Sequence, residues 1–171
     1  MKAAARAGLP IYAECGGLMY LGEAITTQQG EKFPMVGVFP YEFIMDKRPQ
    51  GHGYTILEVA RDNPFFSSGT ILKGHEFHYS RIQPEPGPQE NLVFQVNRGT
   101  GLGGQREGLV FQNVLATYTH LHALGSPEWA AGIVRLAREC RQASRLPAEN
   151  SLQPGSEVPA NRSLGRGVLL S

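Results

Sequence analysis

The feature that most constrains this chain is the segment ECGG at residues 14–17, which lies between an extended run and a helical pattern. Residues Pro10 to Glu14 (PIYAE) predict a short strand, and the apolar positions within Gly16 to Ile25 favour a helix that buries one face. A strand, a tight turn carrying a cysteine and a helix together predict a nucleophile elbow. Such a turn forces its central residue into an unusual backbone conformation, and small neighbours let it close without clashes.

Cys15 is the candidate nucleophile at this turn. The free amides and the positive dipole at the start of a helix are expected to lower the pKa of the thiol and so to increase the reactive thiolate. The backbone amide of Gly16 is a candidate oxyanion donor. The alternative is a buried structural cysteine beside a glycine turn, and the local pattern leaves both open.

Two histidines, His120 and His122, follow the predicted strand Val114 to Tyr118. A cysteine nucleophile needs a base and acid that is close in space but distant in sequence, and either histidine fits. Strand residues alternate between faces, so the two side chains point the same way if the strand continues, whereas a turn separates them. A histidine with a purely structural hydrogen bond is the alternative at this position.

The rest of the chain predicts a sheet-rich middle and one core-facing helix. Ser126 is a plausible N-cap with Pro127 at the first helical position, and Cys140 ends an apolar stripe on that helix. A long loop is expected at Asp46 to Gly53. The predicted strands lie in Phe33 to Ile44, Tyr54 to Ala60, Ile71 to Leu72, Phe77 to Ile82, Asn91 to Val96, Leu109 to Phe111 and Val114 to Tyr118.

Length and charge narrow the function classes. The 171 residues suit one domain, which we expect to span residues 1–141, followed by a disordered tail at 142–171. A formal net charge of +1 gives no field that attracts nucleic acid, and no apolar stretch is long enough to span a bilayer. Two cysteines make no disulfide framework, so a reducing, cytoplasmic setting is expected.

The segment GHEFHYS at residues 74–80 holds further polar candidates. Glu76 and His78 are expected to line a substrate pocket or an interface, or to be solvent-facing residues of a strand. With His75 they also make a zinc centre conceivable, although no Cys-x-x-Cys or His-Glu-x-x-His pattern supports a metal, and we predict none. Arg98 in NRGTG is a candidate for holding a carboxylate, or an ordinary turn arginine.

Four blocks stand out in order along the chain, namely YAECGGLMYL around Cys15, GHEFHYSRI at residues 74–82, NRGTG at 97–101 and ATYTHLH at 116–122. In this order and spacing they resemble the amidotransferase domain of the cobyrinic acid a,c-diamide synthase family. The likeness covers residues 3 to 138. The related cobyric acid synthases typically have Tyr-x-His-Gly at the histidine block, whereas Leu121 stands here, which favours the diamide synthase branch.

The resemblance implies an α/β fold of the class I, triad-type glutamine amidotransferases, with a sheet flanked by helices. It implies that Cys15 is the nucleophile and that His120 activates it, with His122 as second choice. Many class I amidotransferases carry a glutamate two residues after this histidine, where this chain has His122. The third triad residue is therefore missing or supplied from elsewhere.

The resemblance also implies partners outside the chain. Ammonia released from glutamine would pass to a domain that uses ATP and magnesium to amidate the a and c carboxylates of cobyrinic acid in cobalamin biosynthesis. This chain has no G-x-x-x-x-G-K-[ST] loop, and the family's first strands are expected to be missing, so we expect a fragment or one half of a split gene. The alternatives are a cobyric acid synthase or other tetrapyrrole amidotransferase, an inactive remnant or binding subunit, and an independent cysteine hydrolase.

Overall fold

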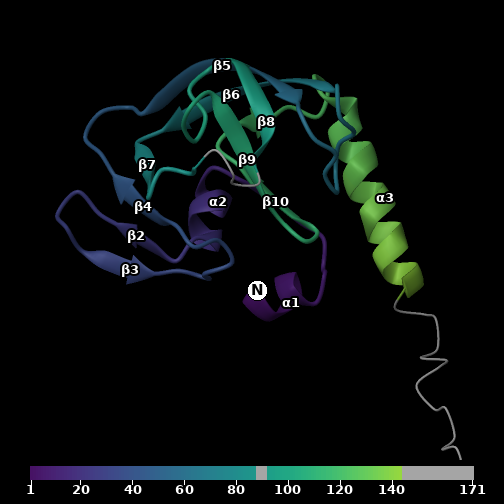
Figure 1. Cartoon of the computed structure of the whole chain (residues 1–171), viewed down its shortest axis with the longest axis horizontal. Coiled ribbons are helices and arrows are strands. Elements are labelled where there is room, and N and C mark those ends of the chain that lie inside the picture. The colour runs from purple at the N-terminus through teal and green to yellow at the C-terminus, as the bar shows by residue number, and fades with distance from the viewer. Residues whose placement is uncertain (88–91, 144–171) are drawn as a thin grey trace, which may run out of the picture.

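The computed structural model describes residues 1–87 and 92–143, which form two sheets and three helices (Figure 1). The helices are α1 (Lys2–Arg6), α2 (Gly16–Leu21) and α3 (Pro127–Ala143). The strands are β1 (Ile11–Glu14), β2 (Ala24–Thr26), β3 (Lys32–Pro34), β4 (Glu42–Met45), β5 (Gly51–Val59), β6 (Ile71–His78), β7 (Ser80–Gln83), β8 (Leu92–Arg98), β9 (Arg106–Phe111), β10 (Val114–Thr117) and β11 (His120–Leu121).

Seven strands form the large sheet in the order β1-β10-β9-β8-β5-β6-β11. β1 and β10 pair in parallel with Glu14 opposite Thr117, whereas the other neighbours in this sheet are antiparallel. Parallel pairing places the carboxyl ends of two strands side by side. Cys15, directly after β1, therefore lies beside the segment that leads from β10 to His120.

The four-stranded sheet has the order β3-β2-β4-β7. Its first strand along the chain, β2, overlaps the segment for which the sequence predicted a helix. The helical pattern was expected to reach Ile25, but α2 ends at Leu21 and Ile25 lies in β2. Gly22 gives the physical reason, because a Cβ there would lie 2.7 Å from the ring of Phe43 and 2.8 Å from a backbone carbonyl. The chain leaves the helix at the point where β4 packs closely against it.

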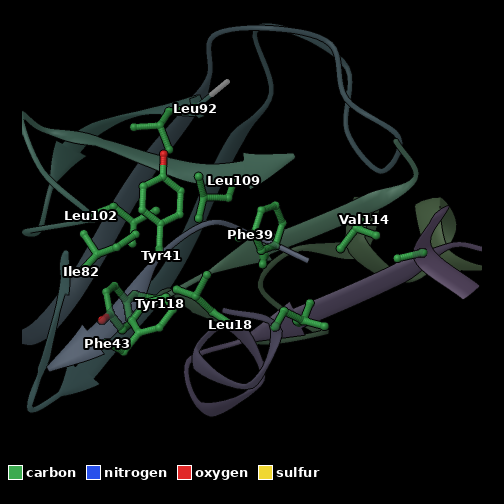
Figure 2. Close-up of a cluster of buried hydrophobic side chains, with 14 residues drawn as sticks. Leu18, Phe39, Tyr41, Phe43, Ile82, Leu92, Leu102, Leu109, Val114 and Tyr118 are labelled. Carbon is green, nitrogen blue, oxygen red and sulfur yellow. The ribbon is translucent and has the colours of Figure 1, made fainter. Parts of the chain in front are cut away.

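Two apolar clusters cover opposite faces of the large sheet. Alternation along β10 is clear, because Val114 and Ala116 belong to one cluster and Leu115 to the other. The first cluster joins the sheet to α1, α2 and the small sheet, and it includes Phe43 and Tyr118 in edge-to-face contact (Figure 2). The second packs under α3. The prediction of a sheet with helices on both sides is therefore confirmed (Figure 1).

The predicted strand boundaries were wrong at the β5–β6 hairpin. The loop expected over Asp46 to Gly53 ends earlier, because β5 begins at Gly51. The segment expected at Ile71 to Leu72 and the first two residues of the one expected at Phe77 to Ile82 form one strand, β6, whereas Ser80 to Ile82 belong to β7 in the small sheet. Lys73 and His75 lie on the exposed face of this strand, whereas Glu76 and His78 are polar residues on its buried face, so no apolar run marks it.

The predicted C-terminal helix is confirmed as α3. Ser126 is buried and its carbonyl accepts the amide of Trp129 at 3.0 Å, while Leu136 is buried against the sheet. The helix continues to Ala143, two residues beyond the expected domain end. The remainder of the predicted tail, 144–171, lies outside the described residues. Within the described part of the chain, no helix combines the length and the apolar character needed to cross a membrane.

Candidate active site

Cys15 occupies a strained turn between β1 and α2. Its φ of 47° and ψ of −100° lie in a region that favours glycine, and such strain clusters at functional sites. The strain is maintained from both sides, because the amide of Cys15 donates to the carbonyl of Thr117 at 2.8 Å and its carbonyl accepts the amide of Met19 at 3.1 Å. The geometry is that of a nucleophile elbow.

The two glycines after Cys15 have different surroundings. A Cβ on Gly17 would lie 3.2 Å from the Cβ of Ala13, so this position packs tightly against β1. A Cβ on Gly16 would meet no atom within 4 Å. The expectation that both glycines are needed to close the turn therefore holds for Gly17 alone, whereas Gly16 faces open space next to the thiol.

The electrostatics of the thiol differ from the sequence-based expectation. Burial raises the pKa of the Cys15 thiol, and the charges of Glu14 and Glu107 raise it further, outweighing the hydrogen bond from the Gly16 amide that lowers it. The start of a six-residue helix does not compensate for the desolvation of a half-buried thiol beside carboxylates. Cys15 is therefore largely a thiol at neutral pH, and it needs a base to become nucleophilic.

His120 reaches the elbow from the other end of the chain. It begins β11, pairs in register with His75 of β6, and stacks its ring on that of His75 at 5.0 Å and 18°. Its Nδ1 lies 3.5 Å from Oε2 of Glu14, the residue before the cysteine. Within the described residues no hydrogen bond joins the sulfur of Cys15 to a histidine, and Sγ lies 4.0 Å from the carbonyl oxygen of Phe77.

His122 is separated from this centre by a turn. It directly follows β11 and is exposed, and its carbonyl accepts the amides of Gly125 and Ser126 at 2.8 and 2.9 Å. Of the two arrangements left open by the sequence, the structure has the turn. His120, and not His122, is the histidine that contacts the residue next to Cys15.

A buried carboxylate holds the segment between β10 and His120. Glu107 is fully buried, and its oxygens accept the amides of Tyr118 and Thr119 and the Thr119 hydroxyl, the last at 2.8 Å. Burial raises the pKa of Glu107 despite these donors. The strand end therefore has a fixed backbone path toward His120. Glu107 is a functional residue that was not predicted, although a glutamate within the apolar run REGLVF is a detectable signal of a buried carboxylate.

Glu76 and His78 lie inside the protein, so the solvent-facing alternative for them is wrong. Both side chains are at most 3% exposed, and Nε2 of His78 lies 3.5 Å from Oε2 of Glu76. The carboxylate also accepts the amides of Thr100 and Gly101 at 2.5 and 3.2 Å. Burial raises the pKa of Glu76, but the contacts with His78 and the two amides outweigh it and hold the pKa below its ordinary value.

His78 connects this pair to the elbow region through Tyr118. The two rings stack at 3.6 Å and 2°, Nδ1 of His78 lies 2.9 Å from the carbonyl of Ser80, and the Ser80 hydroxyl lies 2.8 Å from that of Tyr118. Arg98 lies exposed at the end of β8, next to the loop whose amides bind Glu76. The structure does not bring Arg98 together with Cys15 and His120 through any contact between described side chains.

A hollow of about 640 Å³ adjoins the site on the outer face of the β5–β6 hairpin. It shares His75 and Phe77 with the surroundings of His120 and Cys15. No group of three or more histidine, cysteine, aspartate or glutamate side chains within residues 1–87 and 92–143 has a metal-binding arrangement. The remaining lining of the hollow is His52, Gly53, Tyr54 and Glu76.

Comparisons with known proteins agree with this geometry. Residues 1–128 match the family model of the CobB/CobQ-like glutamine amidotransferase domain. The cobyrinate a,c-diamide synthase of Methanosphaera stadtmanae is 43% identical over 130 residues, which are 76% of this chain and 28% of that protein. The cobyrinate a,c-diamide synthase of Caldanaerobacter subterraneus subsp. tengcongensis is 39% identical over 145 residues, which are 85% of this chain and 31% of that protein.

A solved structure supports the fold. A crystal structure described as a glutamine amidotransferase superposes with a TM-score of 0.53 at 20% identity, covering 80% of this chain and 66% of that one. This chain thus spans about 30% of the length of the curated relatives that it matches. Because the family model covers most of its length, the chain belongs to the CobB/CobQ-like glutamine amidotransferase domain family.

Proposed function

We propose that this chain releases ammonia from glutamine through a covalent intermediate on Cys15. The observation that carries the proposal is the strained cysteine at the β1–α2 turn, with His120 held beside the preceding residue. His120 takes the proton of the Cys15 thiol, and the sulfur attacks the side-chain amide carbon of glutamine. A base is needed because the pKa of the thiol is raised by burial and by neighbouring carboxylates.

The remaining steps follow from the groups around the sulfur. The Gly16 amide stabilises the oxyanion, and the open space beside Gly16 accommodates the tetrahedral carbon. His120 returns its proton to the nitrogen, ammonia leaves, and a glutamyl thioester remains on Cys15. Water then attacks the thioester with His120 as base, which releases glutamate and restores the thiol.

Binding roles for Glu76, His78 and Arg98 stay predictions. Both carboxylate oxygens of Glu76 accept backbone amides, and Nδ1 of His78 lies 2.9 Å from the carbonyl of Ser80, so we propose that Glu76 and His78 shape the site by holding the loop after β8. Arg98 is exposed at the end of β8, next to this loop, and remains the candidate for the carboxylate of glutamine.

We propose that the ammonia serves the amidation of a corrinoid carboxylate, because the relatives are named cobyrinate a,c-diamide synthases. ATP and magnesium would belong to another domain or chain. The glycine-rich turn at residues 99–101 does not fit a nucleotide phosphate, because the amides of Thr100 and Gly101 are already bound to Glu76.

The test is covalent labelling with 6-diazo-5-oxo-L-norleucine, a glutamine analogue, followed by peptide mass spectrometry. We expect one adduct at Cys15, and we expect Cys15→Ala to abolish both the adduct and glutamine hydrolysis, a loss of about a thousandfold or more. Cys140→Ala, which changes the other cysteine on α3, should leave both unchanged.

Two outcomes would overturn the proposal. An unlabelled wild-type protein would indicate an inactive remnant or binding subunit. Turnover of other amides with equal efficiency would instead indicate an independent cysteine hydrolase.

A further inference from the structure

Glu14 lies between the two candidate catalytic residues. It directly precedes Cys15, and its Oε2 is 3.5 Å from Nδ1 of His120. The two side chains are partly exposed, 23% for Glu14 and 34% for His120. The position two residues after His120 is occupied by His122, which supplies no carboxylate and faces solvent beyond a turn. Glu14 is the carboxylate that the fold brings to His120.

The other oxygen of Glu14 is fixed by two donors. Oε1 accepts the hydroxyl of Tyr12 at 3.0 Å and the amide of Leu121 at 3.0 Å. Burial and the Glu14 charge raise the pKa of Tyr12, so its hydroxyl stays protonated and remains a donor. With Oε1 held in this way, the carboxylate plane is set and Oε2 is directed at His120. One carboxylate therefore holds both the ring of His120 and the backbone next to it.

The ring of His120 is restrained on its face as well. His75 stacks against it, and the paired strands β6 and β11 keep the two residues opposite each other. A stacked ring whose Nδ1 points at a carboxylate has little freedom to turn. Its free nitrogen, Nε2, is then the one available for proton transfer.

We propose that Glu14 is the positioning residue that completes the catalytic centre, accepting Nδ1–H of His120 so that Nε2 is the basic nitrogen. The proposal rests on the proposed function of Cys15 and His120. When Nε2 takes the thiol proton, the ring becomes an imidazolium whose charge Glu14 stabilises. When Nε2 passes that proton to the leaving ammonia, the ring returns to the neutral Nδ1–H form.

Glu14→Gln is the most informative variant, because it changes one interaction and can keep the other two. The amide oxygen of glutamine can still accept from Tyr12 and Leu121, whereas its NH₂ group replaces the oxygen that faces Nδ1. The NH₂ group of the glutamine then donates to Nδ1 of His120, which favours the tautomer with its proton on Nε2. Glu31→Gln is the matched control, because Glu31 is exposed in the turn between β2 and β3.

Three measurements on the full 171-residue chain test the proposal. In ¹⁵N NMR spectra of the neutral ring, assigned by comparison with His120→Gln, the wild type should carry the proton on Nδ1 and Glu14→Gln should carry it on Nε2. The inactivation rate constant for 6-diazo-5-oxo-L-norleucine should fall at least about tenfold with its half-saturating concentration within about twofold. Alkylation by iodoacetamide at pH 7 should instead become about twofold faster or more, because the Glu14 charge helps to raise the pKa of the Cys15 thiol.

The opposite directions of the two Cys15 reactions separate positioning from loss of structure, which would move both rates together. An unchanged tautomer with an inactivation rate within twofold of the wild type would overturn the proposal. Absence of labelling in the wild type would instead reject the proposed function, while the tautomer comparison would still decide the role of Glu14.

Discussion

The described residues include two glutamate–histidine pairs in which a ring nitrogen lies 3.5 Å from a carboxylate oxygen. One pair is partly exposed to solvent and the other is buried. Glu14 and His120 are partly exposed next to the thiol, whereas Glu76 and His78 are at most 3% exposed beneath the loop after β8. We propose that the exposed pair exchanges protons with a substrate, whereas the side chains of the buried pair contact groups within the protein. Pairs of similar geometry would then serve chemistry in one place and structure in the other, and solvent access distinguishes them.

His120→Ala tests the exposed pair and should have the largest effect. We expect labelling of Cys15 by 6-diazo-5-oxo-L-norleucine to slow by about 10² to 10⁴. We expect the free energy of unfolding to change by no more than about 0.5 kcal/mol, because the side chain is 34% exposed. Urea unfolding monitored by the single tryptophan, Trp129, gives the second quantity. A large loss of stability would show that the exposed pair is structural too.

Glu76→Ala tests the buried pair and should reverse this result. The change leaves His78 and the amides of Thr100 and Gly101 without their acceptor, so we expect a loss of about 3 to 5 kcal/mol in the free energy of unfolding. The same urea experiment measures it. If stability were kept and the half-saturating concentration of the glutamine analogue rose instead, Glu76 would be a binding residue.

Gly51→Ala tests how tightly the buried pair is enclosed. A Cβ at this position would lie 2.3 Å from Nε2 of His78 and 2.8 Å from the carboxyl carbon of Glu76. We expect a destabilisation of about 1 to 3 kcal/mol, because a packed interior resists added volume. Gly16→Ala is the matched control, since its Cβ would meet no atom within 4 Å, and its stability should stay close to that of the wild type.

The acid dependence of stability should distinguish the two buried carboxylates. The pKa of Glu76 is lowered from 4.5, so its contribution is complete above that value and is lost as the pH falls through the folded-state pKa. The pKa of Glu107 is raised from 4.5, so the folded state keeps the proton on Glu107 to a higher pH than the unfolded state does. Stability therefore falls as the pH rises through the folded-state pKa.

We therefore expect opposite changes in two variants, measured by urea unfolding at a series of pH values. Glu76→Gln should lose stability relative to the wild type as the pH rises from 3 to 6, and Glu107→Gln should gain stability relative to the wild type. Parallel curves for the wild type and Glu107→Gln would mean that Glu107 does not titrate in this range.

The sequence predicted the parts of the site that depend on neighbours along the chain. The elbow at Cys15 and the histidine after β10 are local patterns, and α3 has a capping signal and an apolar stripe. The short helix α2 and the strand β2 were not separated, because the position of Gly22 depends on close packing against Phe43. That contact joins residues that are far apart in the sequence, and the local pattern of apolar residues does not predict which segments pack together.

The contacts that the sequence could not supply are those set by strand register. The Glu14–His120 pair depends on the parallel alignment of β1 with β10, and the burial of Glu76 depends on β5, β6 and the loop after β8. The position of Cys15 at the start of a helix predicted a lowered thiol pKa. This prediction was wrong, because only the folded chain buries Cys15 and brings the charge of Glu107 close to it.

The parallel pairing of β1 with β10 also determines when the proposed nucleophile, Cys15, can meet His120. The Glu14 carboxylate and the Leu121 amide that it binds are 107 positions apart, and contacts of such separation form late, after local hairpins. As the chain is synthesised, Cys15 emerges long before residues 114–121 are available to it. In an incomplete chain, Cys15 therefore has no His120 beside it. The proposed catalytic centre forms only when the contacts between residues 14 and 120–121 have formed.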